Sequence, residues 1–270
     1  MHNEQIPRFR LIIVGDEILS GKRADKHLPK VIELLKERGL QLDGAEYVGD
    51  DPDRITQTLQ RAFASRDVVF STGGIGATPD DHTRQCAARA LGVPLQLHTE
   101  AKRLIEQRGQ ENALEHGLVY ESQSADNLHR LNMGVFPLGA DIIPNPFNRI
   151  PGFSCARVHF VPGFPVMAWP MLAWVLDNHY RAYFQHEARQ ERSVIVFDAM
   201  EATLTPLMEC IERDHENIKV FSLPSVDHPE LGRHIEVGIK GATPSVGPAY
   251  AALLDGLTLL KVRLGTELVQ

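Results

Sequence analysis

The sequence predicts an α/β protein with a three-layer, mostly parallel sheet, followed by a small α+β domain. Short apolar runs such as 67–72 have the composition of strands that are buried on both faces, as strands of parallel sheets are. Amphipathic helical segments of about 10–15 residues separate these runs. In such an alternation each helix connects two parallel strands and packs on a face of the sheet. A polar run at 185–192 then marks the best candidate for a domain boundary.

Glycine, proline and aspartate residues divide the first part of the chain. Gly39 is well placed as the C-cap of one helix, whereas Asp51 and Pro52 suit the N-cap and the first position of the next. The expected elements are strand 9–14, helix 25–38, strand 40–48, a helix from 52, strand 67–72, and a helix from Asp80 or Asp81 to about Leu91.

The pattern becomes more polar after residue 98. Residues 99–132 are helical, and we interpret them as two less buried helices interrupted by Gly109 and Gly117. The segment 145–153 has the proline, glycine and asparagine content of a loop. The other expected elements are two short strands within 135–144, strand 156–161 and an aromatic-rich helix to about Tyr183.

Two domains are therefore expected, at 1–184 and 190–270. An element order of β-α-β-β-α in the second domain suits a small sheet with its helices on one face. These elements are strand 193–198, helix 201–214, strand 218–223, strand 233–240 and helix 244–263.

Charge and composition exclude several classes of protein. The formal net charge is −7 and the pI about 5.9, whereas binding of nucleic acid through bulk charge needs a basic surface. No apolar run approaches the roughly 18–20 residues of a membrane span, and the N-terminus lacks the features of a signal peptide. The three cysteines are far apart and have no zinc-type spacing. We therefore expect a cytoplasmic protein with reduced thiols and without a membrane partner.

The strongest local signal is the segment 71–81, Ser-Thr-Gly-Gly-Ile-Gly-Ala-Thr-Pro-Asp-Asp, which joins a buried strand to a helix. Open α/β sheets bind ligands at the carboxyl ends of their strands. Glycines let the backbone approach a bulky anion, and free N–H groups at the start of the helix attract negative charge. The segment predicts a site for a small phosphorylated ligand, although a tight strand–helix connection explains the same glycines. The residues expected to contact phosphate are Thr72, Gly73, Gly74, Gly76 and Thr78.

Acidic residues accompany this loop. The adjacent carboxylates of Asp80 and Asp81 would repel a phosphate unless a divalent cation such as Mg²⁺ lies between them, and Mg²⁺ is commonly held by carboxylates plus substrate phosphates. Capping of the next helix is the alternative role for either residue. Asp16 and Glu17 follow the first strand at the same expected edge of the sheet and are further candidate metal ligands. Asp50 closes the second strand at that edge.

Further residues are candidates for lining the same cleft. Gly15 and Ser20 lie in the turn after the first strand, where they could contact phosphate. Pro162 and Gly163 follow the strand at the far side of the cleft, although a rigid loop corner is the simpler explanation for them. His82, next to the two aspartates, is the histidine nearest to the proposed site.

As an ordered set, these motifs resemble the molybdopterin-binding (MoaB/Mog-like) domain family, and most closely the N-terminal region of competence/damage-inducible protein A (CinA). The resemblance covers about residues 9–178, and the tail from about 190 to 265 looks like the small KH-like domain that follows in that family. The chain ends before the amidohydrolase domain that CinA proteins often carry. The motifs are Gly15–Leu19, Val48–Asp50, Thr72–Asp81, Pro144–Pro146 and Pro162–Pro165.

The resemblance implies a pocket for molybdopterin or a related nucleotide. Thr78 and the loop glycines would cradle its phosphate, while Asp50 and Asp81 match acidic positions with catalytic and metal-binding roles in Mog-like enzymes. In some relatives this domain hydrolyses the pyrophosphate of ADP-ribose or a related dinucleotide. In others it adenylylates molybdopterin or inserts molybdenum.

Enzymatic activity is left open at this point. One hypothesis is a Mg²⁺-dependent nucleotide pyrophosphatase or molybdopterin nucleotidyl transferase. The alternative is a protein that binds molybdopterin or a nucleotide without turnover, because Asp16 and Ala77 replace the threonine and proline that are usual in the family. A regulatory role of the C-terminal domain is a third hypothesis, but this domain has no basic GxxG loop with which to bind RNA.

We also expect a homo-oligomer, a dimer or a trimer, because residues 164–184 are rich in aromatic and apolar side chains.

Overall fold

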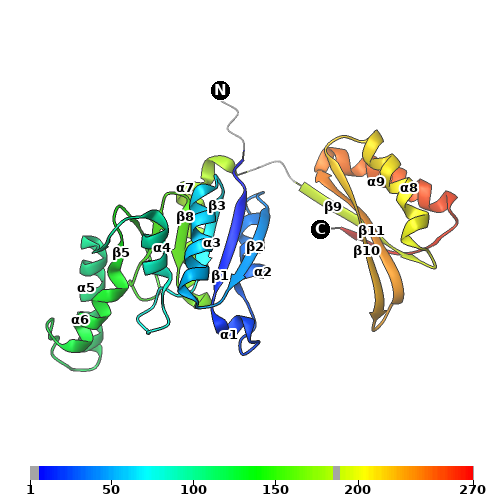
Figure 1. The fold of residues 1–270 in the computed structure, drawn as a ribbon. Helices are drawn as coiled ribbons and strands as arrows, with labels where there is room; N and C mark the ends of the chain where they lie inside the picture. The colour runs from blue at the N-terminus through cyan, green and yellow to red at the C-terminus, as the bar shows by residue number, and fades with distance from the viewer. Residues whose placement is uncertain (1–5, 185–188, 270) are drawn as a thin grey trace. The chain divides into compact units, whose positions relative to one another are not determined.

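The chain folds into two compact units that divide between Phe184 and Gln185 (Figure 1). A computed structural model describes residues 6–184 and 189–269. The first unit is built on a six-stranded sheet with the order β2-β1-β3-β8-β7-β6, and the second on a four-stranded sheet with the order β10-β11-β9-β12.

The sheet of the first unit is parallel in its central part. Strand β1 pairs in parallel with β2 and β3, and β3 pairs in parallel with β8, while β7 pairs antiparallel with β8 and β6. This arrangement confirms the mostly parallel sheet that the sequence predicts. The strands are β1 (Phe9–Val14), β2 (Leu42–Val48), β3 (Val68–Thr72), β6 (Asp141–Ile143), β7 (Gly152–Cys155) and β8 (Val158–Val161).

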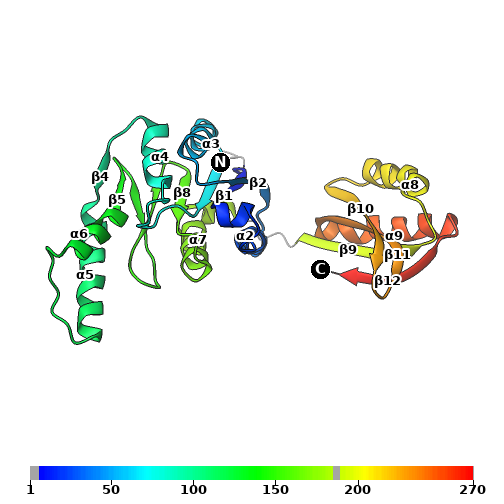
Figure 2. The ribbon, with the colours of Figure 1, turned by 60° about the horizontal axis from the view of Figure 1, so that its bottom comes forward.

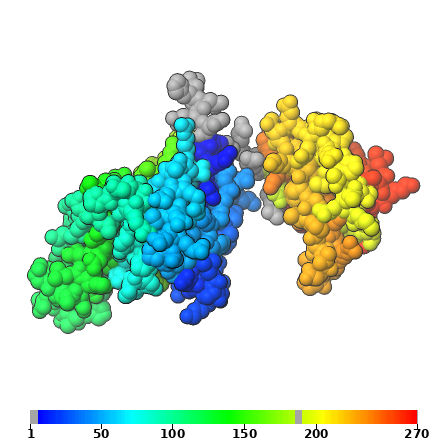
Figure 3. All heavy atoms as spheres, in the orientation of Figure 1, coloured from blue at the N-terminus to red at the C-terminus, as the bar shows by residue number. Residues whose placement is uncertain are grey.

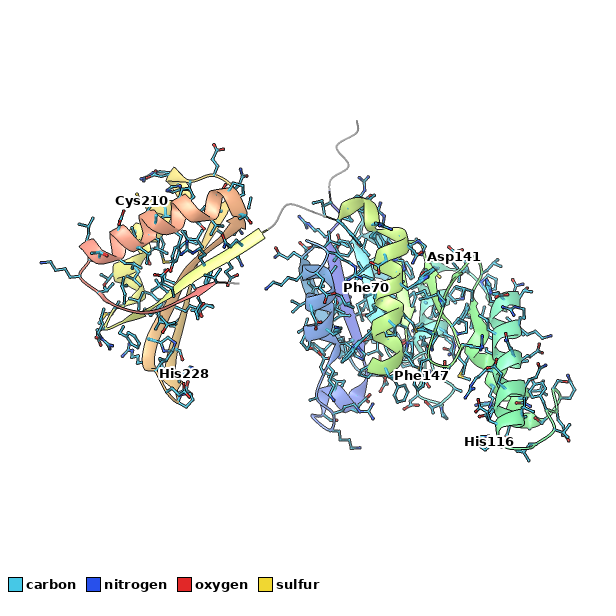
Figure 4. All side chains as sticks on the ribbon, turned by 180° about the vertical axis from the view of Figure 1, so that it is seen from behind. Phe70, His116, Asp141, Phe147, Cys210 and His228 are labelled. Carbon is cyan, nitrogen blue, oxygen red and sulfur yellow. The ribbon has the colours of Figure 1, made fainter. Side chains whose placement is uncertain are left out.

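Helices cover both faces of this sheet and complete the expected three layers (Figure 2). Because side chains of a strand point alternately to opposite faces, Leu11 and Ile13 of β1 belong to one core cluster and Ile12 and Val14 to the other. Helix α2 (His27–Lys36) and helix α7 (Pro165–His179) close the first cluster, which contains Phe70 beneath α7 (Figure 4). Helix α3 (Pro52–Ala64) and helix α4 (Thr83–Leu91) close the second.

Helix α3 begins as its sequence predicts. The Asp51 carboxylate accepts hydrogen bonds from the backbone N–H groups of Asp53 and Arg54, at 3.1 and 2.8 Å, and Pro52 occupies the first helical position. Asp51 therefore satisfies two N–H groups that the helix cannot pair internally.

Substitution of this cap is expected to have a moderate effect. Asp51→Ala should lower the free energy of unfolding of the first unit by about 1 kcal/mol, because the two N–H groups lose their acceptor. Urea titration followed by tryptophan fluorescence measures this, since both tryptophans, Trp169 and Trp174, lie in α7. Asp53→Ala is the control, because this exposed carboxylate of the same helical turn forms a surface salt bridge with Arg89. Equal losses in the two variants would contradict the capping role.

A helical lobe projects beside the sheet, where Figure 3 shows it as a separate bulge. Helix α5 (Thr99–Glu115) and helix α6 (Ala125–Leu131) form it, and His116 lies at its far end (Figure 4). A short antiparallel pair, β4 (Leu95–Leu97) with β5 (Val135–Pro137), connects it to the domain, next to the 3-10 turn η1 (Asn132–Gly134). Contrary to the expectation, Gly109 does not interrupt α5, and its missing side chain leaves room for the ring of Tyr120.

Other expectations about the first unit were wrong in detail. Residues 152–155 form β7 rather than the end of a loop, because a tight turn at Ala156, with φ of 51°, joins them to β8 as a hairpin. The two short strands expected within 135–144 are confirmed as β5 and β6, and they pair with β4 and β7 respectively. Helix α4 begins at Thr83, so neither Asp80 nor Asp81 is its N-cap, which is His82. A short helix α1 (Asp16–Leu19) replaces the expected turn, and the 3-10 turn η2 (Arg181–Tyr183) follows α7.

The second unit is an antiparallel sheet with two helices on one face. Alternate residues of β9 and β11, such as Val194 and Val237, form one core cluster with both helices. His228 lies near the tip of the β10–β11 ribbon (Figure 4). The elements are β9 (Arg189–Phe197), α8 (Glu201–Asp214), β10 (Ile218–His228), β11 (Gly232–Ala242), α9 (Thr243–Leu259) and β12 (Arg263–Val269).

The second unit differs from the sequence prediction at both ends. The expected helix 244–263 ends at Leu259, and its last residues belong to the approach to β12, a strand whose side chains are mostly exposed. Hydrogen bonds to β9 hold this strand in place, and it has no buried apolar face. Its sequence therefore lacks the apolar pattern from which a strand could have been predicted. Of the polar run 185–192, residues 185–188 lie outside the described residues, and β9 begins at Arg189. No helix within 6–184 or 189–269 is long and apolar enough to cross a membrane.

Candidate functional site

The turns that follow β1, β2, β3 and β8 meet at one edge of the sheet. The Gly15 N–H donates to the Val48 carbonyl at 3.0 Å, which joins the turns after β1 and β2. The Gly73 N–H donates to the Val161 carbonyl at 3.1 Å, and a Cβ on Gly163 would lie 3.4 Å from the Gly73 Cα. The carboxyl ends of the parallel strands therefore gather the predicted motifs, as the sequence indicates.

The first two glycines of the loop are required by its packing. Gly73 and Gly74 have φ angles of 97° and 67°, and a Cβ on either would overlap the Val14 carbonyl oxygen or the Thr83 hydroxyl. Thr83 also holds the loop, because its N–H donates to the Gly74 carbonyl at 2.9 Å and its hydroxyl to the Gly73 carbonyl at 3.1 Å. Glycine at these positions thus lets the loop lie directly against β1 and the start of α4.

Asp81 organises the second half of the loop. Its Oδ2 accepts hydrogen bonds from the Thr78 N–H at 2.8 Å and from the Thr78 hydroxyl at 2.5 Å, and Gly76 leaves room for this carboxylate. Beneath the loop lies Arg84, 4% exposed, whose guanidinium donates to the Ile75 carbonyl. Burial lowers the pKa of Arg84, and the negative charge of Asp81 opposes this shift. Asp81 therefore stabilises the loop through hydrogen bonds and through the buried arginine.

A second set of carboxylates forms an acidic group, defined as Asp16, Glu17, Asp50 and Asp80. Asp16 and Asp50 bind each other's backbone: the Asp16 N–H donates to Asp50 Oδ2 at 2.9 Å and the Asp50 N–H to Asp16 Oδ1 at 3.2 Å. Burial raises the pKa of Asp50, the hydrogen bond from the Asp16 N–H opposes this, and the charges of Asp16, Glu17 and Asp80 raise it further. Negative charge is thus concentrated beside the loop.

The acidic group suits a metal ion only in part. Considering residues 6–184 and 189–269, no three His, Cys, Asp or Glu side chains converge closely enough to hold one. Mg²⁺, however, is usually held by one or two carboxylates together with substrate phosphates and water. Asp16 and Asp50 are the adjoining pair that fits this requirement, provided that a ligand supplies the remaining oxygens.

A cavity of about 270 Å³ opens at the carboxyl ends of β1 and β3. Its walls come from the end of β1, helix α1, the segment leading into α2, and the start of α7. Arg23 and Glu17 lie 3.8 Å apart at its rim. The apolar side chains of the wall are Ile13, Val14, Ile18, Ala24, Phe164 and Pro165, and the other lining residues are Glu17, Arg23, Lys26, His27, Thr72 and Gly163.

The predicted site residues therefore fall into three adjoining parts. Glu17, Thr72 and Gly163 line the cavity, and Glu17 belongs to the acidic group as well. Gly73 to Asp81 form the loop, and Gly15 joins the turns after β1 and β2. Ser20 is exposed at the end of α1, and Pro162 precedes the cavity wall without lining it.

Several residues at this edge, among them His27 and Arg84, have no counterpart in the sequence prediction, whereas Phe164 belongs to the predicted Pro162–Pro165 motif. His27 and Phe164 line the cavity, and Arg84 supports the loop from below. A histidine or arginine on the buried stripe of an amphipathic helix is the signal that identifies His27 and Arg84, because such positions usually hold apolar side chains. Arg23 and Lys26 lie in an exposed turn and carry no comparable signal.

The first unit is thus an open α/β domain with a cavity and a glycine loop at the carboxyl ends of its parallel strands, where domains of this class bind their ligands. A family model described as a probable molybdopterin binding domain matches residues 10–182. The chain therefore belongs to this molybdopterin-binding domain family, which confirms the resemblance seen in its motifs.

The relatives extend this likeness to CinA-like proteins. One from Geobacter metallireducens is 27% identical over 266 residues, which cover 96% of this chain and 60% of the relative. Another, from Geobacter sp. (strain M21), is 31% identical over 208 residues, or 75% of this chain and 47% of the relative. The chain thus spans about half the length of these curated relatives. The crystal structure of the protein CinA, with unknown function, from Thermoplasma acidophilum is also similar: the sequence identity is 27% and the TM-score 0.54, and the match covers 63% of this chain and 98% of that chain.

Proposed function

We propose that the first unit binds a phosphorylated pterin or nucleotide, such as molybdopterin, at the carboxyl ends of β1 and β3. The observation that carries this proposal is the cavity of about 270 Å³ beside Thr72 and Gly73, in a chain of the molybdopterin-binding domain family. Apolar walls suit a ring system, while Arg23 and Lys26 at the rim supply positive charge for a phosphate.

A chemical step on a phosphate anhydride is the finer part of the proposal. Asp50 would position an attacking water or hydroxyl, and its partner Asp16 would join it in holding a divalent cation together with phosphate oxygens of the ligand. When bound, such a cation supplies electrostatic stabilisation of the phosphoryl oxygens. Asp81 and Arg84 would keep the loop in place, so that its backbone N–H groups meet the same oxygens.

A melting experiment with the full chain tests binding first. Pterin, ADP-ribose, FAD and ATP, each with Mg²⁺ or Co²⁺, should include at least one ligand that raises the Tm, because binding to the folded state stabilises it. Chromatography of the same mixtures then tests for AMP. Binding with AMP release supports a pyrophosphatase, and binding without any product supports the non-catalytic alternative. A Tm that none of these ligands changes would count against the proposed function.

Two substitutions separate chemistry from folding. Asp50→Asn and Asp81→Asn should each lower turnover at least about 100-fold. The first removes the carboxylate charge that acts on water and metal, and the second removes the carboxylate charge that holds the loop. The asparagine oxygen can still accept the backbone hydrogen bonds, and the Tm of Asp50→Asn should stay equal or rise because like-charge repulsion is relieved. Asp53→Asn, an exposed aspartate nearby, is the matched control. Full turnover in both site variants contradicts the catalytic part of the proposal.

A homo-oligomer remains a proposal as well. The apolar residues of 164–184 on which it rests are largely used within the first unit, where Met171, Leu172, Val175 and Leu176 are buried. Phe164 and Val166, at the start of α7, are 55% and 53% exposed and are the candidates for contact with a second copy. Light scattering coupled to gel filtration distinguishes a monomer from a dimer or a trimer.

A further inference from the structure

The helical lobe contacts the glycine loop through a side chain that the proposed function does not use. His129 lies in the last turn of α6, and its Nε2 is 3.0 Å from the Ala77 carbonyl oxygen. A carbonyl oxygen only accepts, so Nε2 carries a proton and is the donor of this hydrogen bond. The bond therefore ties the lobe to a loop that lies 52 residues earlier in the chain.

A second contact joins the lobe to the same edge of the sheet. Strand β6 runs parallel to β8, because each of them pairs antiparallel with β7. The segment that follows β6 therefore leaves the sheet at the carboxyl ends of the strands, as the glycine loop does. Arg149 of this segment donates from Nε to the Glu111 carboxylate of α5 at 3.0 Å. Each helix of the lobe thus contacts one connection at the edge where the ligand is proposed to bind.

The two halves of the glycine loop are held differently. Thr83 and Arg84 of α4 hold the first half, because they donate hydrogen bonds to the carbonyls of residues 73–75. In the second half, Thr78 and Asp81 bond each other. Within the part of the chain that the structure describes, the hydrogen bond from His129 is the one that connects residues 76–80 to another element. Ala77 itself leaves its backbone free to rotate, whereas a proline would fix φ.

We propose that His129 is a positioning residue for the ligand site, through which the lobe holds the second half of the glycine loop in its binding conformation. The role of His129 in ordering the loop stands on the contacts alone, and its consequence for ligand binding rests on the proposed function. Coupling between two parts of a protein is reciprocal. A ligand at the loop therefore also strengthens the attachment of the lobe.

Three substitutions isolate the hydrogen bond. His129→Ala removes the donor, whereas His129→Gln places an amide N–H near the position of Nε2 and restores it. Arg130→Ala is the matched control, because this exposed neighbour in α6 donates to Asn127 of its own helix instead of to the loop. Loss of one such hydrogen bond changes the opening equilibrium of the loop by about threefold to tenfold.

Hydrogen exchange of the unliganded full chain, measured by mass spectrometry on peptides covering residues 75–81, tests the ordering of the loop. The amides of Thr78 and Asp81 report it, because both have acceptors within the loop. Exchange should be about threefold to tenfold faster in His129→Ala than in the wild type, and unchanged in His129→Gln and Arg130→Ala. Unchanged exchange in His129→Ala, or the same acceleration in Arg130→Ala, would overturn the role of His129.

Calorimetric titration tests the consequence for binding. The probe is methylenediphosphonate with Mg²⁺, a pyrophosphate analogue whose bridging carbon prevents hydrolysis. Its Kd should rise about threefold to tenfold in His129→Ala and stay at the wild-type value in His129→Gln and Arg130→Ala. Equal Kd values in the wild type and His129→Ala would overturn the positioning role and leave the binding function standing. A wild type that does not bind the probe counts against the proposed function, and loop exchange still decides the role of His129.

Discussion

Gly73→Ala is expected to destabilise the first unit by about 4 kcal/mol, the sum of backbone strain and steric overlap. The φ angle of Gly73 is 97°, a conformation that costs an L-residue about 1–2 kcal/mol. A Cβ there would also overlap the Val14 carbonyl oxygen, which is backbone of the central strand β1 and cannot rotate away. Relief requires a shift of the loop from the sheet, so binding of any ligand at the loop should weaken as well.

Gly92→Ala is the matched control for this substitution. Gly92 also has a positive φ, 69°, but among the described residues no atom lies within 4 Å of a Cβ built on it. This variant therefore carries the backbone strain alone, about 1 kcal/mol. Tryptophan fluorescence in urea reports the first unit for both variants, because Trp169 and Trp174 lie in α7. Equal losses of stability in the two variants would show that the overlap with β1 does not matter.

The second large effect is a loss of stability in acid that depends on His159. This residue, 2% exposed, lies between two hydrogen-bonding groups: Nδ1 is 2.8 Å from the Ser154 hydroxyl and Nε2 is 2.7 Å from the Tyr180 hydroxyl. Burial, with a smaller effect of the neighbouring His179, lowers the pKa of His159 from 6.5 to about 3. The folded protein thus holds this imidazole neutral through a buried hydrogen-bond network.

The direction of the pH dependence follows from proton binding. In the unfolded chain the His159 ring takes up a proton near its ordinary pKa of 6.5, whereas in the folded state it does so only near pH 3. Its contribution to stability is therefore complete above about pH 6.5 and is lost as the pH falls, by about 1.4 kcal/mol per pH unit and up to about 5 kcal/mol in total.

His159→Gln isolates this contribution from that of the other titrating groups. The variant should be less stable than the wild type at pH 7, because at least one buried hydroxyl of Ser154 and Tyr180 loses a partner. The difference in free energy of unfolding between the two proteins should shrink by several kcal/mol between pH 6.5 and 4, because the wild type loses the contribution of neutral His159, which the variant does not have. Urea titrations at steps of half a pH unit measure this gap, and a gap that stays constant would exclude the neutral buried histidine.

The particular elements that the sequence predicts well are those with strong local signals. Apolar runs identify β1 and β3, and Asp51 with Pro52 marks the start of α3, because each signal depends on a few neighbouring residues. Strand β7 was missed because its hairpin turns at Ala156, a residue type that rarely adopts positive φ. Strand β12 was missed because it has no apolar face in its own sequence. It forms through its pairing with β9, about 70 residues earlier.

The sequence by itself determined the main alternation of strands and helices in the first unit, the position of the glycine loop, and the family, since these follow from local pattern and ordered motifs. Only the tertiary structure decided which carboxylates adjoin. It pairs Asp16 with Asp50, 34 residues away, and turns Asp81 toward Thr78 in its own loop. The structure alone also buried His27 against Gly163, 136 residues later, in the wall of a cavity. Such contacts depend on packing between distant segments, and no periodicity of the chain encodes them.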